Sequence, residues 1–447
     1  MLPSARSVQR RRLASILAAN AGTEYGSRSG FREIGDAAAY RARVPVARFE
    51  DLEGAIARMA AGERNVLVAE PVVAFEETGG SSAGPKLIPY TESLLRAFRR
   101  ALLAWLDDLA REHPEVAAGS AYWAISPAAR APRTTTGGIP VGLGSDAAYF
   151  GAELAPLVLE TLAVTPEVGR HVDIERWRAA TCERLAACGD LALISVWSPT
   201  FLLGLLEGIA LDPAVISCWD HAAARPYADE LRRRFPRARV QGKGLLATES
   251  VVSIPLEGLD WPVLAVDSAY FEFLDGAGTA HEAWALDPGG EYELLLTTEG
   301  GLYRYAIGDR VRVRGYAGEA PLLEFLGRAA GVDLCGEKLS ESFVTQALAP
   351  LGLTFALLAP GRGGKPGYAL VVDAAEVPRE RAAALLERAE RALAANPQYE
   401  YARALGQLAP LELQRREQPL EAWIGERLRR GQRLGDIKPP ALAHEPF

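Results

Sequence analysis

Residues 65–91 read NVLVAEPVVAFEETGGSSAGPKLIPYT, two apolar runs followed by a loop of small residues. The runs Val66–Ala69 and Val72–Phe75 are β-branched and apolar, and the chain then becomes rich in glycine. After Pro89 the pattern ESLLRAFRRALLAWLDDLAREH repeats apolar residues at helical spacing. The sequence therefore predicts a strand, a small-residue loop and a helix over residues 70–112.

The loop Thr78–Lys86, TGGSSAGPK, has the composition of a phosphate-binding loop. Glycines let the backbone fold around an anion so that several N–H groups point at it. Hydroxyl groups add hydrogen-bond donors, and Lys86 adds a positive charge. The loop is not of the Walker A type, because Leu87 follows Lys86 where that motif has Ser or Thr. A surface turn without a ligand is the plain alternative.

Strand-like and helix-like segments alternate through the middle of the chain. This alternation indicates an α/β fold with mostly parallel sheets flanked by helices. Short strands with turns between residues 265 and 327 predict a small antiparallel, β-barrel-like region. A small α+β unit follows. The predicted helices are 4–20, 36–61, 147–161, 174–187, 200–210 and 222–235, and the predicted strands are 121–125, 192–196, 215–218 and 263–266.

Length and composition are those of a globular protein with more than one domain. The chain has 447 residues, and a single hydrophobic core stops growing well before that length. Its hydrophobic fraction of 49% and charged fraction of 24% are ordinary for globular proteins. Because the pattern changes between residues 328 and 340, we predict a large N-terminal domain over 1–335 and a small C-terminal domain over 336–447.

Charge and cysteine usage exclude several classes of protein. The net charge of −8 disfavours a nucleic-acid-binding protein, which normally has a basic face. The four cysteines form no CxxC pair, so we expect no zinc site. Scattered thiols suit the reducing cytoplasm. No apolar run approaches the ~20 residues that a membrane helix needs, so we expect a cytoplasmic protein without a membrane partner.

A second motif, GLYRYAIGDRVRV, occupies residues 301–313. Apolar or aromatic residues alternate with charged ones, as in a strand with one buried face. Gly308 and Asp309 predict a turn that presents a carboxylate, and a carboxylate accepts hydrogen bonds from the two hydroxyls of a ribose. The plain alternative is a hairpin whose charges lie in solvent.

Together these motifs resemble the acyl acid amido synthetases of the auxin-responsive type, in the adenylate-forming superfamily. The superfamily's phosphate loop reads TSGTTGxPK. Thr78, Gly80, Pro85 and Lys86 match it, Ser81 and Ser82 replace the two threonines, and Gly79 and Ala83 depart from it. The stretch TTEGGLYRYAIGDRVRV is similar to the family's GLYRYxxGD core.

Further motifs of the same family follow in order. GKGLLATESVVSIPL, with Thr248 and Glu249, resembles the superfamily's turn that ends in Thr-Glu. FLGRAAGVDLCGEKLSE resembles its hinge, with Arg328 and Lys338, and GQRLGDIKPPAL resembles the family's terminal segment, with Lys438. The resemblance spans residues 31–441 and implies a mobile C-terminal domain.

The resemblance also implies a role for each of these residues. Glu249 binds Mg²⁺, and Thr248 lies near the α-phosphate or the acyl carboxylate. Asp309 holds the ribose hydroxyls, and Arg328 lies by the ribose or the hinge. Lys338 reaches a phosphate, and Lys438 stabilises the α-phosphate. The loop residues that hold the β- and γ-phosphates of ATP are Thr78, Gly80, Ser81, Ser82 and Lys86.

The predicted activity is ATP-dependent adenylation of a small carboxylic acid, followed by transfer of the acyl group to an amino acid or another amine. Adenylation concentrates negative charge, so its site needs cations and N–H donors. An acyl pocket is expected between the sheet and its helices, with candidates at 130–145 and 200–206. Transfer to a thiol of coenzyme A or a carrier protein, or nucleotide binding without catalysis, are the alternatives.

Overall fold

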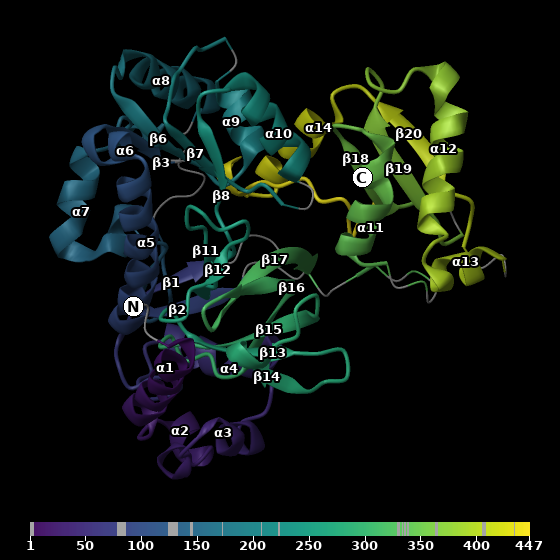
Figure 1. Ribbon diagram of the computed structural model, residues 1–447. Coiled ribbons are helices and arrows are strands. Elements are labelled where there is room, and N and C mark those ends of the chain that lie inside the picture. Colours follow the sequence, from purple (N-terminus) through teal and green to yellow (C-terminus); the bar gives the residue numbers. More distant parts are fainter. Residues whose placement is uncertain are drawn as a thin grey trace. The chain divides into compact units, whose positions relative to one another are not determined.

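The structure is a computed structural model (Figure 1). Its contacts divide the chain into two compact units. Unit 1 comprises 1–196, 208–218 and 235–325, and unit 2 comprises 197–207, 219–234 and 326–447. The described residues are 4–77, 86–123, 133–143, 146–171, 173–206, 208–221, 224–328, 331–332, 334, 337, 339–362, 365–404, 408–432 and 434–447.

Unit 1 begins with α1 (Ala5–Asn20), α2 (Glu24–Arg28), α3 (Ala37–Arg43) and α4 (Phe49–Ala60). The single helix predicted over 36–61 is wrong, because the chain breaks between α3 and α4. Pro45 has no N–H to donate, and it forces Val44 into an extended conformation (φ −106°, ψ 115°). Asp36 caps α3 by accepting a hydrogen bond from the backbone N–H of Ala39, 2.8 Å away.

A four-stranded parallel sheet follows the order β3-β6-β7-β8. It confirms the predicted parallel sheet, although the sequence patterns had not indicated the short β8. The other helices of unit 1 are α5 (Glu92–Glu112), α6 (Pro114–Ala118), α7 (Gly151–Glu160) and α8 (Ile174–Ala187). The strands are β3 (Ser120–Trp123), β6 (Leu191–Ser195), β7 (Val215–Cys218) and β8 (Arg239–Gly242).

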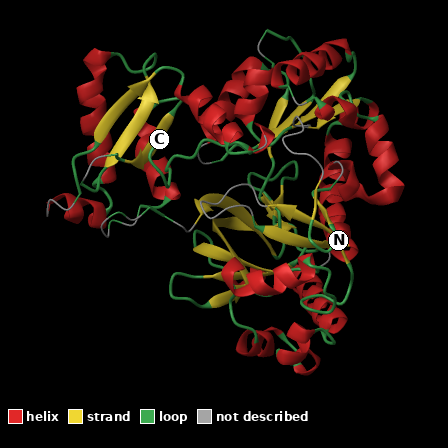
Figure 2. Cartoon of the chain, turned by 180° about the vertical axis from the view of Figure 1, so that it is seen from behind, coloured by secondary structure: helices red, strands yellow, loops and turns green. Residues whose placement is uncertain are grey.

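Antiparallel strands dominate the rest of unit 1 (Figure 2). The seven-stranded sheet has the order β11-β12-β17-β16-β15-β13-β14, with β11 and β14 at its two ends. Residues 263–266, predicted within the parallel region, contribute β12 to this sheet instead. The strands are β11 (Ser253–Ile254), β12 (Val263–Leu264), β13 (Tyr270–Leu274), β14 (Ala280–Glu282), β15 (Glu291–Thr297), β16 (Tyr305–Ala317) and β17 (Ala320–Arg328).

Unit 2 holds two helices from the middle of the chain, α9 (Pro199–Leu205) and α10 (Arg225–Arg234), and the C-terminal elements. In its sheet β18 pairs antiparallel with β19, and β19 pairs parallel with β20. The C-terminal helices and strands form the predicted α+β unit, although the sequence patterns had not indicated the short helix α13. The elements are α11 (Glu341–Leu348), β18 (Ala356–Pro360), β19 (Tyr368–Asp373), α12 (Arg379–Leu393), α13 (Pro397–Ala404), β20 (Glu412–Arg416) and α14 (Pro419–Arg429).

A buried ion pair joins the N-terminal helices to the large antiparallel sheet. Arg304 Nε lies 2.9 Å from Glu272 Oε2, and the two side chains are 8% and 1% exposed. The same guanidinium donates through Nη1 to the carbonyl oxygen of Val44, 2.9 Å away. Burial raises the pKa of Glu272, and the neighbouring Arg304 and Arg41 oppose that rise. The stability of the ion pair therefore depends on its short hydrogen bonds as well as on the opposite charges.

Replacing Arg304 with Ala leaves the Glu272 carboxylate buried without its closest cation. We expect a loss of about 3–5 kcal/mol in the free energy of unfolding, measured by urea denaturation. Arg111→Ala is the matched control, since Arg111 pairs with Asp107 on the exposed face of α5 at 3.1 Å. That change should cost about 0.5 kcal/mol or less. Equal losses for the two variants would contradict a stabilising role for the buried pair.

Candidate functional site

The predicted phosphate loop joins two antiparallel strands. β1 (Val72–Glu77) pairs with β2 (Leu87–Thr91), and Glu77 lies opposite Leu87. The predicted order of strand, loop and helix is therefore corrected to strand, loop, strand and helix, because α5 begins only after β2. The predicted residues Thr78, Gly80, Ser81 and Ser82 lie outside the described residues.

Lys86 is the one predicted loop residue that the structure describes, and it lies beside the start of α4. Its Nζ is 3.4 Å from Glu50 Oε1 and 4.9 Å from the centroid of the Phe49 ring. The Lys86 side chain is 25% exposed. A half-buried cation therefore stands at the end of the loop that is expected to hold phosphates.

Thr248 and Glu249 form the two-residue turn between β9 (Leu246–Ala247) and β10 (Ser250–Val251). The Tyr90 hydroxyl, at the end of β2, donates to the carbonyl oxygen of Thr248 at 2.5 Å. Burial, above all, raises the pKa of Tyr90, and nearby Tyr149, Glu76 and Glu249 raise it further. The phenol therefore stays protonated and serves as a donor. Glu249 is buried, at 7% exposure.

Asp309 lies at an irregularity in the ladder between β15 and β16. Glu293 is opposite Arg310 and Leu295 is opposite Ala306, so the register shifts between these two pairs. Gly308, in the shifted part, has φ +82°, a conformation that side chains with a Cβ disfavour. Such bulges re-aim side chains, and this one holds Asp309 at 7% exposure.

The first half of the GLYRY motif is structural. The Tyr303 ring stacks on Tyr25 with centroids 4.9 Å apart, and its hydroxyl donates to the carbonyl oxygen of Leu67 at 2.7 Å. Arg304 makes the buried pair with Glu272. These contacts hold the segment that leads into the bulge at Gly308.

The hinge and terminal segments belong to unit 2. Lys438 Nζ lies 5.7 Å from the centroid of the Trp219 ring. Backbone hydrogen bonds on either side of Leu358 join β18 to Ala441 and Ala443, which anchors the segment that carries Lys438. Lys338 lies outside the described residues. Arg328 ends β17, and its side chain is not among those described.

Sequence reasoning missed Glu337, the residue before Lys338. Its carboxylate is fully buried, accepts from the Leu334 backbone N–H at 2.7 Å and bonds the Tyr368 hydroxyl. The sequence offered little signal, because Glu337 is one of four charged residues in DLCGEKLSE. The two hydrogen bonds fix the Glu337 side chain between Leu334 and Tyr368.

It also missed a polar row at the carboxyl ends of the parallel strands. Ser195, Ser217 and Gln241 occupy matching positions on β6, β7 and β8, and Lys243 follows just beyond. Lys243 Nζ lies 2.7 Å from Ser195 Oγ and is buried. The signal was a polar residue at or next to the end of each strand, which is Ser195 in LALIS, Ser217 in VISC and Gln241 in RVQG.

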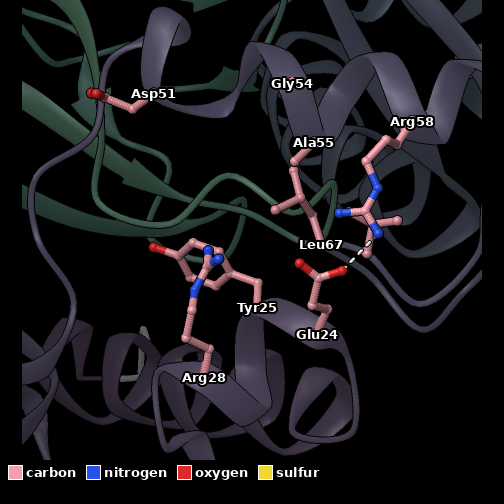
Figure 3. Close-up of a pocket in the computed structure, with 9 residues that line it drawn as sticks. Glu24, Tyr25, Arg28, Asp51, Gly54, Ala55, Arg58 and Leu67 are labelled. Atoms are coloured by element: carbon pink, nitrogen blue, oxygen red, sulfur yellow. Dashed lines mark hydrogen bonds and ion pairs between the residues drawn. The ribbon is translucent and has the colours of Figure 1, made fainter.

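A hollow of about 290 Å³ between α2 and α4 is a separate feature (Figure 3). Its charged groups neutralise one another, since Arg58 Nη2 lies 2.7 Å from Glu24 Oε2 and also pairs with Glu63. The Arg28 guanidinium lies over the Tyr25 ring, 5.3 Å from its centroid. None of the predicted site residues that the structure describes lines this hollow, so we assign it no role in the site.

The donor set fits a magnesium ion that ATP would hold. Mg²⁺ is commonly bound through one or two carboxylates together with substrate phosphates. Glu249 offers one buried carboxylate next to the turn residue Thr248. Across the described part of the chain, no three or more His, Cys, Asp or Glu side chains lie together so that they could hold a metal ion. The described helices also include none long and apolar enough to cross a membrane.

Three domains of one protein family match successive parts of the chain. Residues 1–207 match the GH3 family N-terminal domain, 262–328 the GH3 family central domain and 342–446 the GH3 family C-terminal domain. The chain belongs to the GH3 family. This confirms the predicted resemblance to acyl acid amido synthetases of the auxin-responsive type, and the GH3 domains follow one another in the expected order.

Curated GH3 relatives carry enzyme names. A probable indole-3-acetic acid-amido synthetase of Oryza sativa subsp. japonica is 31% identical over 47% of this chain and 50% of the relative. One of Arabidopsis thaliana is 25% identical over 78% of this chain and 71% of the relative. The chain thus spans about half the length of the rice relative. Both names describe ligases, which is the enzyme class predicted for this chain.

Solved structures share the fold of this GH3 chain. The GH3.15 acyl acid amido synthetase superposes with a TM-score of 0.83 at 18% identity, covering 98% of this chain and 91% of its own. A 2-hydroxyisobutyryl-CoA ligase superposes with a TM-score of 0.62 at 14% identity, covering 95% and 92%. The fold of this chain is therefore like that of these two enzymes, and at these identities the likeness shows the fold alone.

The strain of the backbone at Gly308 can be tested with substitutions that change only the conformation the residue prefers. A Cβ added there meets no atom within 4 Å, so substitution costs only the energy of the positive φ. Gly308→Ala should lower the free energy of unfolding by about 1–2 kcal/mol, and Gly308→Asn by less, because Asn tolerates this region. Urea denaturation of both variants measures the difference.

Gly35→Ala is the control, since a Cβ at Gly35 also meets open space and Gly35 has no positive φ. It should leave the free energy of unfolding unchanged or raise it. An Asn variant at Gly308 no more stable than the Ala variant would argue against the strained bulge.

Proposed function

We propose that this protein is an ATP-dependent acyl acid amido synthetase, which adenylates a carboxylic acid and transfers the acyl group to the amine of an amino acid or another amine. The observation that carries the proposal is the run of three GH3 domains over most of the chain. The buried Glu249 beside Thr248, and Asp309 in its bulge, support it.

In the first step an oxygen of the acid's carboxylate attacks the α-phosphorus of ATP, and pyrophosphate leaves. Negative charge builds up on the phosphate oxygens, so cations and N–H donors stabilise the transition state. We assign the β- and γ-phosphates to the loop of Thr78, Gly80, Ser81, Ser82 and Lys86. We assign further charge stabilisation to Lys338 and Lys438, and Thr248 to the α-phosphate or the acyl carboxylate.

Glu249 would hold Mg²⁺ through its carboxylate, and the ion supplies positive charge to the phosphate oxygens when it is bound. The Tyr90–Thr248 hydrogen bond fixes the turn that carries Glu249. A fixed turn matters because a ligand displaced by about 1 Å loses much of its effect on a reacting centre. Tyr90 is therefore a positioning residue for the metal ligand.

Asp309 would accept hydrogen bonds from the two ribose hydroxyls, and Arg328 would lie near the ribose or the hinge. A carboxylate accepts two such bonds in place of water. The bulge at Gly308 aims this carboxylate. Asp309, which belongs to unit 1, would then hold the sugar of the nucleotide apart from the residues assigned to its phosphates.

In the second step the amine nitrogen attacks the acyl carbon, the bond from that carbon to the phosphate oxygen breaks, and AMP leaves. The nitrogen loses a proton, and the product is an amide. No covalent bond to the enzyme is needed, because the mixed anhydride is already activated. We propose that a small domain over 336–447 moves against a large adenylation domain over 1–335 between the two steps.

Transfer to a thiol is the second candidate, because the fold is also that of a 2-hydroxyisobutyryl-CoA ligase. The product separates the two candidates. We expect wild-type protein to exchange labelled pyrophosphate into ATP only when a suitable carboxylic acid is present. We expect an amide when amino acids are added and no thioester with coenzyme A.

The exchange assay is run over a panel of aromatic and aliphatic acids, with amino acids and coenzyme A as separate acceptors. A thioester in place of the amide would assign the protein to the second candidate. Nucleotide binding without exchange across the whole panel would favour a binding protein that has lost catalysis.

Asp309→Ala should weaken ATP binding by about 10- to 100-fold, since it removes hydrogen bonds to a charged acceptor. Isothermal titration calorimetry with ATP and Mg²⁺ measures the change. Asp275→Ala serves as the control, because Asp275 pairs with His281 at a hairpin of the same sheet and is 29% exposed. ATP affinity unchanged in the Asp309 variant would remove Asp309 from the ribose site.

A further inference from the structure

The carboxyl edge of the parallel sheet carries one continuous row of side chains. Trp123 on β3 pairs with Ser195 on β6, Ser195 with Ser217 on β7, and Ser217 with Gln241 on β8. Residues in register on neighbouring parallel strands point to the same face of the sheet. Lys243 follows Gln241 by two positions, so extended backbone would direct it to that face too.

Contacts with α5 confirm which face this is. Trp105 of α5 packs edge-on against Trp123, with centroids 6.2 Å apart, and its Nε1 donates to Gln241 Oε1 at 2.8 Å. Lys243 Nζ lies 5.4 Å from the centroid of the same Trp105 ring. The row and Lys243 therefore share the space between the sheet and α5.

The side chains of this row, together with Lys243, can donate hydrogen bonds to a ligand. Lys243 is 9% exposed, and its ammonium donates to the neutral Ser195 hydroxyl at 2.7 Å. A hydroxyl that accepts such a bond keeps its own proton to donate. Ser217 Oγ is fully buried and has no hydrogen-bond partner among the residues that the structure describes. An ammonium and two hydroxyls are a typical donor set for an oxyanion.

Trp105, which borders this donor set, is itself held in place. Gln241 accepts from Trp105 and donates through Nε2 to Glu257 Oε1 at 2.8 Å, and the Glu257 backbone N–H donates to Asp108 Oδ2 at 2.7 Å. This chain of hydrogen bonds fixes the ring over which the Lys243 ammonium lies. Fixed supporting residues are what a specificity site requires.

The position suits a ligand as well as the chemistry does. In α/β proteins ligands bind beyond the carboxyl ends of parallel strands. The Thr248 turn is linked to the N-terminal half of α5 through Tyr90. The Tyr90 hydroxyl bonds Thr248, and its ring packs on Phe98 of α5, with ring centroids 5.7 Å apart. Phe98 and Trp105 are seven residues apart, which is about 10 Å along a helix.

We propose that Lys243, with Ser195 and Ser217, binds a second anionic group on the acyl acid, remote from the carboxylate that is activated. The preferred substrates are then dicarboxylic acids or acids of like charge. This inference rests on the proposed function, because the acid is taken to be the substrate. It adds the substrate class and a specificity-determining residue.

The test compares matched acids that differ only in the second carboxylate. The pairs are terephthalate with benzoate, adipate with hexanoate, and naphthalene-2,6-dicarboxylate with 2-naphthoate. The measured quantity is the ratio of kcat/KM for the dicarboxylate to that for its partner, in acid-dependent pyrophosphate exchange. We expect Lys243→Met to lower this ratio at least tenfold for the best pair. Lys365→Met, the same change at an exposed lysine, should leave the ratio unchanged.

Ser217→Ala guards against a folding defect, since Ser217 loses no partner within the described protein. It should lower the same ratio several-fold while its urea unfolding midpoint stays that of the wild type. A ratio that stays constant in both variants overturns the proposal. So does an equal loss for both members of every pair, which would place Lys243 at the activated carboxylate.

Calorimetric titration of the acids alone separates this inference from the proposed function. Wild-type protein should bind the dicarboxylate of the best pair at least tenfold more tightly than its partner, and Lys243→Met should abolish the difference. That result without any exchange would sink the synthetase and keep the anion site. Exchange with apolar acids, with no dicarboxylate bound more tightly than its partner, would keep the synthetase and overturn the anion site.

Discussion

The ion pair between Arg304 and Glu272 is the constraint on which the larger unit depends. Arg304 adopts φ +45°, a conformation that costs about 1–2 kcal/mol for a residue with a side chain. That cost is sustained because the backbone N–H of Arg304 bonds Thr297 Oγ1 while its side chain reaches Glu272 and Val44. One residue thereby ties β13, β15 and the end of α3 together, immediately before the strand that carries Asp309.

This arrangement divides the GLYRYAIGD motif into a structural part and the part that carries Asp309. Its most recognisable residues, Tyr303 and Arg304, are buried and bond protein groups, so their substitution would abolish activity by loosening the fold. Asp309 lies beyond them, after a glycine with a positive φ and a shift in the ladder. A short motif therefore combines an anchor with the carboxylate that is predicted to bind the ribose. Loss of activity alone does not distinguish the two, but unfolding free energy and nucleotide affinity measured together do.

Sequence patterns predicted the layers of the fold because long periodic segments leave a clear signal. α1, α5 and α8 follow their predicted ranges closely. The failures have local causes. Pro45 divides a helical pattern that composition alone makes continuous, and β8 is only four residues long and begins with Arg239. The phosphate loop proved to be a hairpin connection, since LIPYT was too short to separate from the helix after it.

The candidate site was predictable only where family motifs exist. Thr248, Glu249 and Asp309 were predicted from such motifs, and the structure describes all three. Lys243, Ser195 and Ser217 lie on three separate segments, so only the register of the parallel sheet brings them together. The sequence alone shows only polar residues at or just beyond strand ends, and such residues are common where a strand leads into a turn.

The same register brings a buried lysine to this edge of the sheet. Burying an ammonium costs several kcal/mol unless an anion or good hydrogen bonds compensate. The hydrogen bond to the Ser195 hydroxyl and the face of the Trp105 ring contribute to that compensation. An oxyanion bound at the same place would add to it. The parallel sheet supplies the alignment that lets one cation and two hydroxyls meet the same ligand group.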